Sequence, residues 1–553
     1  MKELIKSISR KEKIIVWVII FALVILLILP FVYLFVTAPV GYQWTGLHTM
    51  TPGDFNNYFA YFEQIKDGHY LFIDHYTSEE QLRNIFKPEW LAIGLVGKLF
   101  NLDNRLLMQL ARSILIIPFL WILYLFISYF FKSLKKRIAS FIFLVFASGL
   151  GLVPLLLFQT DNSMDLWVPE INVFLTSLNS PHLIYSFSLL LLVFLFVFLG
   201  WEKNKGSYFI YAGLLANLSF ISHPFNLPTI FGVTGAIVLY KIVKNRKIFI
   251  SFFYNWILFC LVTLPSLGYL VYLFMFDVPT QIKAVQNECL TTPLWQTIFS
   301  YGFILVFAIL GVVFIFKYKK VIPEKIKYLI IWAALQFALI YSPVVWQRRM
   351  TEGLSIPLGL LAIIGIFYLA RLIKKKKFKV FETLNNKFLI IAVFIIIFCL
   401  SNIVVYSNDF KIHQTQRSEN YVYAPDYIYD SFDWFDKNLK ENDIILADPF
   451  VSNYIPGRTG NIVYAGHGVE TLYFQAKKYQ IVWFFKEETA LEEKIEFLSK
   501  NFIDYIFFSD YPIVLGEDFS VPEFLNNKKY FKPVFEKQGI IIYEVVSHVI
   551  LID

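Results

Sequence analysis

The sequence predicts a polytopic α-helical membrane protein of about 11 transmembrane helices with a C-terminal extracytoplasmic α/β domain. Of its 553 residues 57% are hydrophobic, 19% aromatic and 17% charged, whereas soluble domains have roughly 25% charged residues. Up to residue 406, long apolar runs alternate with short lysine-rich segments. Such runs are typical of membrane-spanning helices.

Eleven segments are long enough, or nearly so, to span a bilayer, which takes about 20 residues. The first is apolar for about 24 residues, longer than the apolar region of a signal peptide, so we interpret it as an uncleaved helix. The segment "PEWLAIGLVGKLF" (88–100) is shorter and predicts an interfacial or re-entrant helix. The predicted spans are 14–37, 105–131, 138–158, 183–200, 207–222, 228–243, 248–273, 297–316, 328–342, 354–371 and 388–406.

Basic residues in the short loops predict the orientation. On one side lie 26 Lys and Arg, in segments 1–13, 132–137, 201–206, 241–247, 317–327 and 372–387. On the other side only 3 occur, in loops 159–182, 223–227, 274–296 and 343–353. Because basic loops stay inside, we expect a cytoplasmic N-terminus, an extracytoplasmic C-terminus and a multi-pass protein of the plasma membrane. The net charge of +8 therefore indicates contact with membrane lipids rather than with nucleic acid.

The predicted domains are a transmembrane domain, 1–406, and a soluble α/β domain, 407–553. The first contains a long external loop, 38–104, with interfacial helices. In the second, strands are predicted at 443–448, 461–467, 505–510 and 539–545, and a helix at 491–502. The three cysteines, Cys260, Cys289 and Cys399, form no CxxC, so neither a disulfide framework nor a zinc site is expected.

Polar residues in the external loops are the candidate site residues. Asp54, in "TPGDFNNY", either caps a helix that starts at Phe55 or serves as a general base at the membrane surface. Tyr58 belongs to an aromatic cluster that suits an interfacial helix or sugar stacking. Candidates in the later loops are Glu170, His182, His223 and Asn226, which either sit at the interface or line a substrate cavity.

The segment "WQRRMTEG" carries Gln347, Arg348 and Arg349 on the outer side, where basic residues are disfavoured. Two interpretations remain open. The arginines pair with Glu352 or with the acids of loop 159–182, which include Asp161 and Asp165. Alternatively they bind an anion, because the guanidinium fork matches phosphate oxygens. A metal bound by the loop acids is possible in principle, but hard cations need several converging oxygens and none is assigned.

Together these features resemble the GT-C superfamily of membrane glycosyltransferases, and in layout its polyprenyl-phosphate-sugar-dependent members, such as protein mannosyltransferases and aminoarabinose transferases. The matching features are the early acid Asp54, the Pro-led helix 88–100, arginines at the start of the next helix, late outer arginines and a C-terminal soluble domain. The paired acids and the Pro-Pro of many members are absent. No WWDYG-like motif occurs, so transfer to asparagine is not expected.

The resemblance implies an inverting transfer from a polyprenyl-phosphate sugar to a glycan, lipid or protein acceptor. Asp54 would activate the acceptor hydroxyl, and Arg348 and Arg349, with Gln347, would hold the departing phosphate. The lipid-linked sugar is a substrate, so no cofactor and no metal is expected. One alternative is a flippase or transporter, but such a protein is expected to carry charged residues within its spans as ion or proton relays. A second alternative is a non-catalytic scaffold with an outer binding domain.

Overall fold

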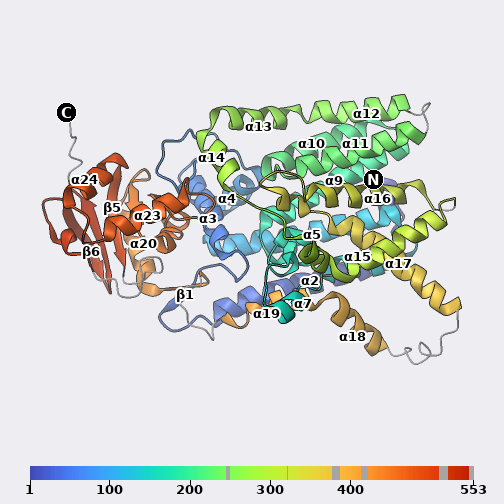
Figure 1. Cartoon of the computed structure of the whole chain (residues 1–553), viewed down its shortest axis with the longest axis horizontal. Coiled ribbons are helices and arrows are strands. Elements are labelled where there is room, and N and C mark those ends of the chain that lie inside the picture. Colours follow the sequence, from blue (N-terminus) through green and yellow to red (C-terminus); the bar gives the residue numbers. More distant parts are fainter. Residues whose placement is uncertain (245–248, 321, 376–386, 413–420, 510–520, 547–553) are drawn as a thin grey trace. The chain divides into compact units, whose positions relative to one another are not determined.

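The computed structural model describes residues 1–244, 249–320, 322–375, 387–412, 421–509 and 521–546. Parts of the predicted inward loops 241–247 and 372–387 lie outside these ranges. The chain forms two compact units. Figure 1 labels their helices and strands. Unit 1 comprises Met1–Pro30, Leu110–Val271 and Glu288–Asn408, and unit 2 comprises Phe31–Gln109, Tyr272–Asn287 and Asp409–Asp553. The predicted domain boundary at residue 406 stays a prediction.

Unit 1 is helical. Its elements, some of which continue into unit 2, are α1 (Lys2–Lys6), α2 (Arg10–Val36), α5 (Asn104–Phe130), α6 (Leu134–Phe146), α7 (Leu152–Phe158), α8 (Val173–Leu178), α9 (Pro181–Lys203), α10 (Gly206–Ser222), α11 (Asn226–Lys244), α12 (Phe249–Val262), α13 (Leu264–Phe276), α15 (Leu294–Lys317), α16 (Glu324–Leu339), α17 (Ser355–Lys375), α18 (Lys387–Phe398) and α19 (Leu400–Asn408). The described residues of this unit also form three 3₁₀ helices: η1 (Met164–Leu166), η2 (Pro169–Ile171) and η3 (Gln347–Thr351).

Six described helices are long and apolar enough to cross a membrane, or seven if α12 and α13, bent by 47°, form one span. The six are Arg10–Val36, Asn104–Phe130, Pro181–Lys203, Asn226–Lys244, Leu294–Lys317 and Gln347–Ile373. All seven coincide with predicted spans. The other four predicted spans contain shorter helices, so a total of about 11 stays a prediction.

The predicted span 138–158 is wrong as a continuous helix, because α6 ends at Phe146 and α7 begins at Leu152. Ala147 is extended, with a ψ of 131°. Within the break, Gly149 lies against the backbone of α15, where any Cβ would overlap the carbonyl oxygen of Ser300. The amide of Leu150 donates to the carbonyl of Phe299 at 2.7 Å, which joins the break to α15. Close backbone contact, which only glycine permits, thus replaces helical hydrogen bonds here.

Unit 2 begins with the segment predicted as the first external loop. It contains β1 (Tyr42–Trp44), α3 (Pro52–Lys66) and α4 (Pro88–Phe100), and the last matches the predicted short helix. These helices pack through a buried aromatic cluster that includes Phe55, Phe59, Phe62 and Trp90. A separate short helix, α14 (Val278–Gln286), comes from the segment that follows α13. The aromatic packing fixes where α3 begins and hence where Asp54 lies.

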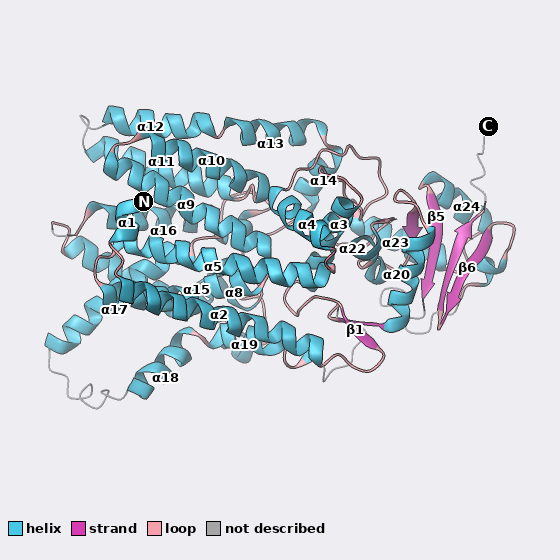
Figure 2. Cartoon of the chain, turned by 180° about the vertical axis from the view of Figure 1, so that it is seen from behind, coloured by secondary structure: helices cyan, strands magenta, loops and turns pink. Residues whose placement is uncertain are grey.

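The rest of unit 2 is a mixed α/β fold, with the strands shown in magenta in Figure 2. Its elements are β2 (Tyr423–Pro425), α20 (Asp426–Asn438), β3 (Ile444–Leu446), α21 (Pro449–Ser452), α22 (Ile455–Thr459), β4 (Ile462–Val463), α23 (Phe474–Phe485), α24 (Leu491–Lys500), β5 (Ile503–Ser509), η7 (Glu523–Asn526), β6 (Phe531–Lys537) and β7 (Ile540–Val545). β2 pairs with β1, and the others form a sheet of order β4-β3-β5-β7-β6.

Each of the four predicted strand segments contains a strand, although the one predicted at 461–467 is reduced to Ile462–Val463, and the helix predicted at 491–502 ends at Lys500. Strand β3 is parallel to both β4 and β5. Successive side chains along each strand point to opposite faces of the sheet, so both faces can be covered by a core. On β5, Phe507 packs in one core with Phe435 of α20, whereas Phe508 packs in the other with Phe484 of α23. The antiparallel strand β6 was not predicted. It contains Pro533 and lies at the sheet edge, where proline is tolerated.

Candidate functional site

Asp54 is the third residue of α3. The helix begins at Pro52, a favoured first-turn residue, and the capping position is Thr51, with a φ of 49°. The prediction that Asp54 caps a helix starting at Phe55 is therefore wrong. The Asp54 side chain is 39% exposed, and its Oδ1 lies 3.4 Å from Nε2 of His467. The carboxylate thus has both a partner and access to solvent.

His467 lies in the loop between β4 and α23 and is buried. Its Nδ1 accepts the backbone N–H groups of Val469 at 3.1 Å and Glu470 at 3.2 Å. The ring hydrogen is therefore on Nε2, which faces Asp54. Burial lowers the pKa of His467, but the Asp54 carboxylate and the nearby Glu470 outweigh burial and hold that pKa above its ordinary value. The Nε2–H side of the imidazole thus faces the Asp54 carboxylate at ion-pair distance.

Asp54 and His467 line a cavity of about 300 Å³. Three aromatic side chains also line it, and the complete set is Gly53, Asp54, Tyr421, Pro449, Phe450, Asn453, Gly466, His467, Gly468, Val469 and Phe474. Tyr58 is not in this set, because its ring stacks on Trp90 of α4 with centroids 4.5 Å apart. An apolar wall with a few fixed polar groups is the usual construction of a small-molecule site.

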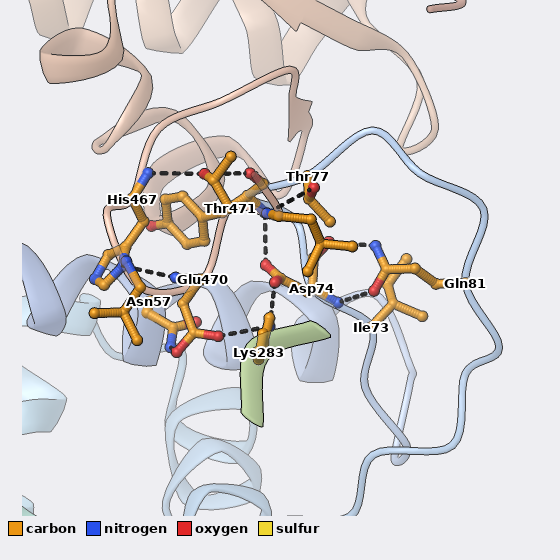
Figure 3. Close-up of polar contacts among 12 residues, drawn as sticks. Asn57, Ile73, Asp74, Thr77, Gln81, Lys283, His467, Glu470 and Thr471 are labelled. Atoms are coloured by element: carbon orange, nitrogen blue, oxygen red, sulfur yellow. Dashed lines mark hydrogen bonds and ion pairs between the residues drawn. The ribbon is translucent and has the colours of Figure 1, made fainter. Parts of the chain in front are cut away.

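A charged cluster supports the His467 loop from behind (Figure 3). Lys283 of α14 lies 2.7 Å from Oε2 of Glu470 and also pairs with Asp74. Glu470 Oε1 in turn accepts Nδ2 of Asn57, one turn after Asp54 on α3, at 2.9 Å. Burial lowers the pKa of Lys283, but the two carboxylates outweigh it and raise that pKa. The cluster therefore ties α14, α3 and the His467 loop together.

Other residues at the end of α14 bind the same loop. Gln286 donates from Nε2 to the carbonyl of Thr471 at 2.9 Å and accepts the amide of Tyr473 at 3.0 Å. Asn287 donates to the carbonyl of Val469 at 3.0 Å. Within unit 2, the chain from residue 469 to residue 473 is thus held by α14 and also by the segment at Tyr76 and Thr77, to which Thr471 and Leu472 are hydrogen-bonded.

In unit 1, Arg349 donates to Glu170 Oε1 at 2.6 Å. Glu170 is buried, and burial raises its pKa, but Arg349 and His223 together outweigh burial and the pKa is lowered. The Arg348 guanidinium lies over the ring of Trp167, 4.3 Å from its centroid. The structure therefore shows Arg349 in an ion pair with an acid of loop 159–182, which is the first of the two interpretations.

Glu352 belongs to a buried cluster of its own. His223 Nδ1 lies 2.8 Å from Oε2 of Glu352. Ser186 donates to Oε1 at 2.8 Å, and Asn226 donates to the same oxygen at 3.2 Å. The structure therefore brings together two predicted cavity residues, His223 and Asn226, around a carboxylate.

The remaining predicted residues have local partners. His182 Nδ1 lies 2.9 Å from Oγ of Ser180. The Gln347 amide, oriented to donate, lies 3.0 Å from the carbonyl oxygens of Ile340 and Ser342. A catalytic or binding role for these residues, as for the arginines, stays a prediction.

Sequence reasoning missed His467, Lys283 and Glu470. His467 lies in "GHG" (466–468), which is too short to be a phosphate-binding loop. Lys283 carried a usable signal, because it is the single basic residue of loop 274–296. Among the described residues, no three His, Cys, Asp or Glu side chains lie together as a metal site would need.

No protein-family model and no curated protein sequence matches the chain. Solved structures do resemble it. An oligosaccharyltransferase from Archaeoglobus fulgidus, in its apo form, gives a TM-score of 0.54 at 12% identity over 88% of this chain and 69% of that one. ArnT from Cupriavidus metallidurans, bound to undecaprenyl phosphate, gives 0.50 at 12% identity over 96% and 98%.

The arabinofuranosyltransferase AftD from Mycobacteria also gives a TM-score of 0.50 at 12% identity, over 95% of this chain but only 40% of that one. All three are GT-C glycosyltransferases. At sequence identities this low, the structural likeness establishes the fold alone and does not identify substrates. The chain therefore has the fold of the GT-C superfamily of membrane glycosyltransferases, the superfamily that its sequence layout resembles.

Proposed function

We propose that the protein is an integral membrane glycosyltransferase that moves a sugar from a polyprenyl-phosphate donor to an acceptor hydroxyl on the extracytoplasmic face. The observation that carries the proposal is the Asp54 carboxylate, which is partly exposed in a cavity and held by His467. The plasma membrane, about 11 spans, an inside N-terminus and an outside C-terminal domain belong to the same proposal. The acceptor is a glycan, a lipid or a protein.

Asp54 is the proposed general base. It takes the proton of the acceptor hydroxyl as that oxygen attacks the anomeric carbon. The bond from this carbon to the phosphate oxygen breaks, and the polyprenyl phosphate leaves with the bonding electrons. A single displacement of this kind inverts the anomeric configuration and needs neither a cofactor nor a metal. The N–H of His467 supports the role because it fixes the orientation of the carboxylate.

Arg348, Arg349 and Gln347 are the proposed donor-phosphate residues. A guanidinium group matches phosphate oxygens and stabilises charge that develops on the leaving group. Arg349 pairs with Glu170 and Arg348 lies over the ring of Trp167, so each guanidinium group has a contact that orients it. ArnT was solved with undecaprenyl phosphate and the A. fulgidus enzyme with dolichol-phosphate, which supports a polyprenyl-phosphate donor here.

The test uses purified full-length protein in proteoliposomes with a panel of labelled polyprenyl-phosphate sugars. We expect release of polyprenyl phosphate from one donor, and loss of at least 100-fold in Asp54→Asn. The matched control, Asp67→Asn, changes a carboxylate just beyond the other end of α3 and keeps activity. Full activity in Asp54→Asn excludes this base. Movement of the lipid between leaflets without sugar transfer establishes the flippase alternative instead.

A further inference from the structure

We propose that the cavity beside Asp54 and His467 is the acceptor site and that it takes an uncharged sugar ring. The inference rests on the proposed function, since it assigns the substrate class of the same site. Three properties of the cavity lead to it: the charge around it, the chemistry of its wall, and the origin of its residues.

The charge around the cavity disfavours an anion. Asp54 is its lining carboxylate, and none of the described lining residues is Lys or Arg. Behind the wall, Lys283 is engaged by two acids, Asp74 and Glu470. With Asp74 ionised these four side chains sum to two negative charges, and with Asp74 protonated they sum to one; a protonated His467 would offset one of them. A phosphorylated or carboxylated acceptor would enter against that charge.

A cationic acceptor is disfavoured for a different reason. An ammonium group would pair with the exposed Asp54 carboxylate and lower its basicity, and the proposed reaction needs that basicity. A neutral hydroxyl group instead places its proton against the carboxylate without competing for charge. The acceptor class that suits both constraints is uncharged and rich in hydroxyl groups.

The wall chemistry fits such a ring. Tyr421, Phe450 and Phe474 supply aromatic surface for the C–H faces of a sugar. Asn453 is fixed between Asn56, whose amide donates to its Oδ1 at 2.8 Å, and the carbonyl of Gly466, which accepts its Nδ2 at 2.9 Å. The volume of about 300 Å³ is at the lower end for small-molecule pockets, so it suits a single ring.

The origin of the residues assigns the selectivity. Nine of the eleven lining residues come from the C-terminal segment between Tyr421 and Phe474, and only Gly53 and Asp54 come from α3. The catalytic group and the recognition surface are therefore contributed by different parts of the sequence. On this proposal the C-terminal domain selects the acceptor.

The experiment is ligand-observed NMR on the full chain in nanodiscs, without donor. The probes are D-glucose, D-galactose, D-mannose and L-arabinose, with D-glucuronate, glucose 6-phosphate and D-glucosamine as charged analogues. We expect at least one neutral sugar to bind at least tenfold more tightly than each of the three charged sugars. Phe474→Leu and Tyr421→Leu should each weaken the binding of that neutral sugar at least fivefold. Tyr479→Leu, an exposed aromatic residue on the same helix as Phe474, leaves binding unchanged.

Equal binding of charged and neutral sugars overturns the proposal, as does neutral-sugar binding that both cavity variants leave intact. The release assay on the protein with Asp54 intact separates this inference from the proposed function. Neutral-sugar binding by that protein, combined with no release of polyprenyl phosphate from any donor, keeps the sugar site and refutes the transferase. Sugar transfer without any binding of free neutral sugars in this cavity keeps the transferase and refutes the sugar site.

Discussion

Lys283→Met tests whether α14 holds the His467 loop. The substitution removes the ammonium group that Asp74 and Glu470 share, and it keeps most of the side-chain volume. Removing one partner of a buried ion pair costs about 3–5 kcal/mol. The Lys283 side chain is 17% exposed, and burial already raises the pKa of Asp74, so this acid readily takes up a proton. We therefore expect the lower end, about 3 kcal/mol, which corresponds to about 100-fold more frequent opening.

The assay is hydrogen–deuterium exchange followed by mass spectrometry. Reporter amides are those of His467, which donates to Oγ1 of Thr471, and of Thr471, which donates to the carbonyl of His467. Peptides covering 466–474 should exchange about 100-fold faster, while β5 stays unchanged. The matched control is Lys532→Met, which breaks an exposed pair with Glu544 and costs less than about 1 kcal/mol. Unchanged exchange at 466–474 in Lys283→Met refutes the clamp, as does an equal increase in the control.

Three further predictions are measured as thermal unfolding of the purified protein. Arg349→Ala leaves Glu170 buried without its cation and should cost about 3 kcal/mol, and adding Glu170→Gln should recover most of that loss; no recovery contradicts the pairing. Burial raises the pKa of Asp165 to about 7, so its contribution is present at pH 4 and lost as the pH rises through 7. Asp165→Asn should therefore raise the melting temperature by several degrees at pH 8 but hardly at pH 4, and equal shifts exclude this titration. Gly149→Ala should lower stability by about 1–3 kcal/mol, because its Cβ would overlap the Ser300 carbonyl; unchanged stability contradicts that close approach.

The elements that sequence patterns predicted well are those whose own residues determine them. The short helix at 88–100 was found at the same bounds because proline starts it and Asn101 ends it in a left-handed conformation. The strands β3, β5 and β7 are apolar runs bounded by turns. By contrast, the break within 138–158 depends on contact with α15, and β6 depends on an edge position for Pro533. Neither contact is visible in the local sequence.

The candidate site was predicted in part for the same reason. Asp54 stands out because it is an isolated acid after a helix, and the structure places it in a cavity. Its partner His467 lies far along the chain, and the residues between them give no periodic pattern that would connect the two. The partner of Arg349 was foreseen as an open alternative, since loop 159–182 contains acids and no base. Which acid it would be required the fold.

The cluster behind the cavity also has a consequence for biosynthesis. Asn57 and Glu470 are 413 residues apart, and Lys283 and Glu470 are 187 apart. At translation rates of 5–20 residues per second, roughly 20 to 80 seconds separate the synthesis of α3 from that of the His467 loop. During that interval Asp54 has no imidazole partner, and the charge cluster around Asp74 is incomplete. The cavity therefore forms only in chains whose C-terminal segment has been synthesised and folded, so a ribosome that stalls late yields a protein with its helices but without its pocket.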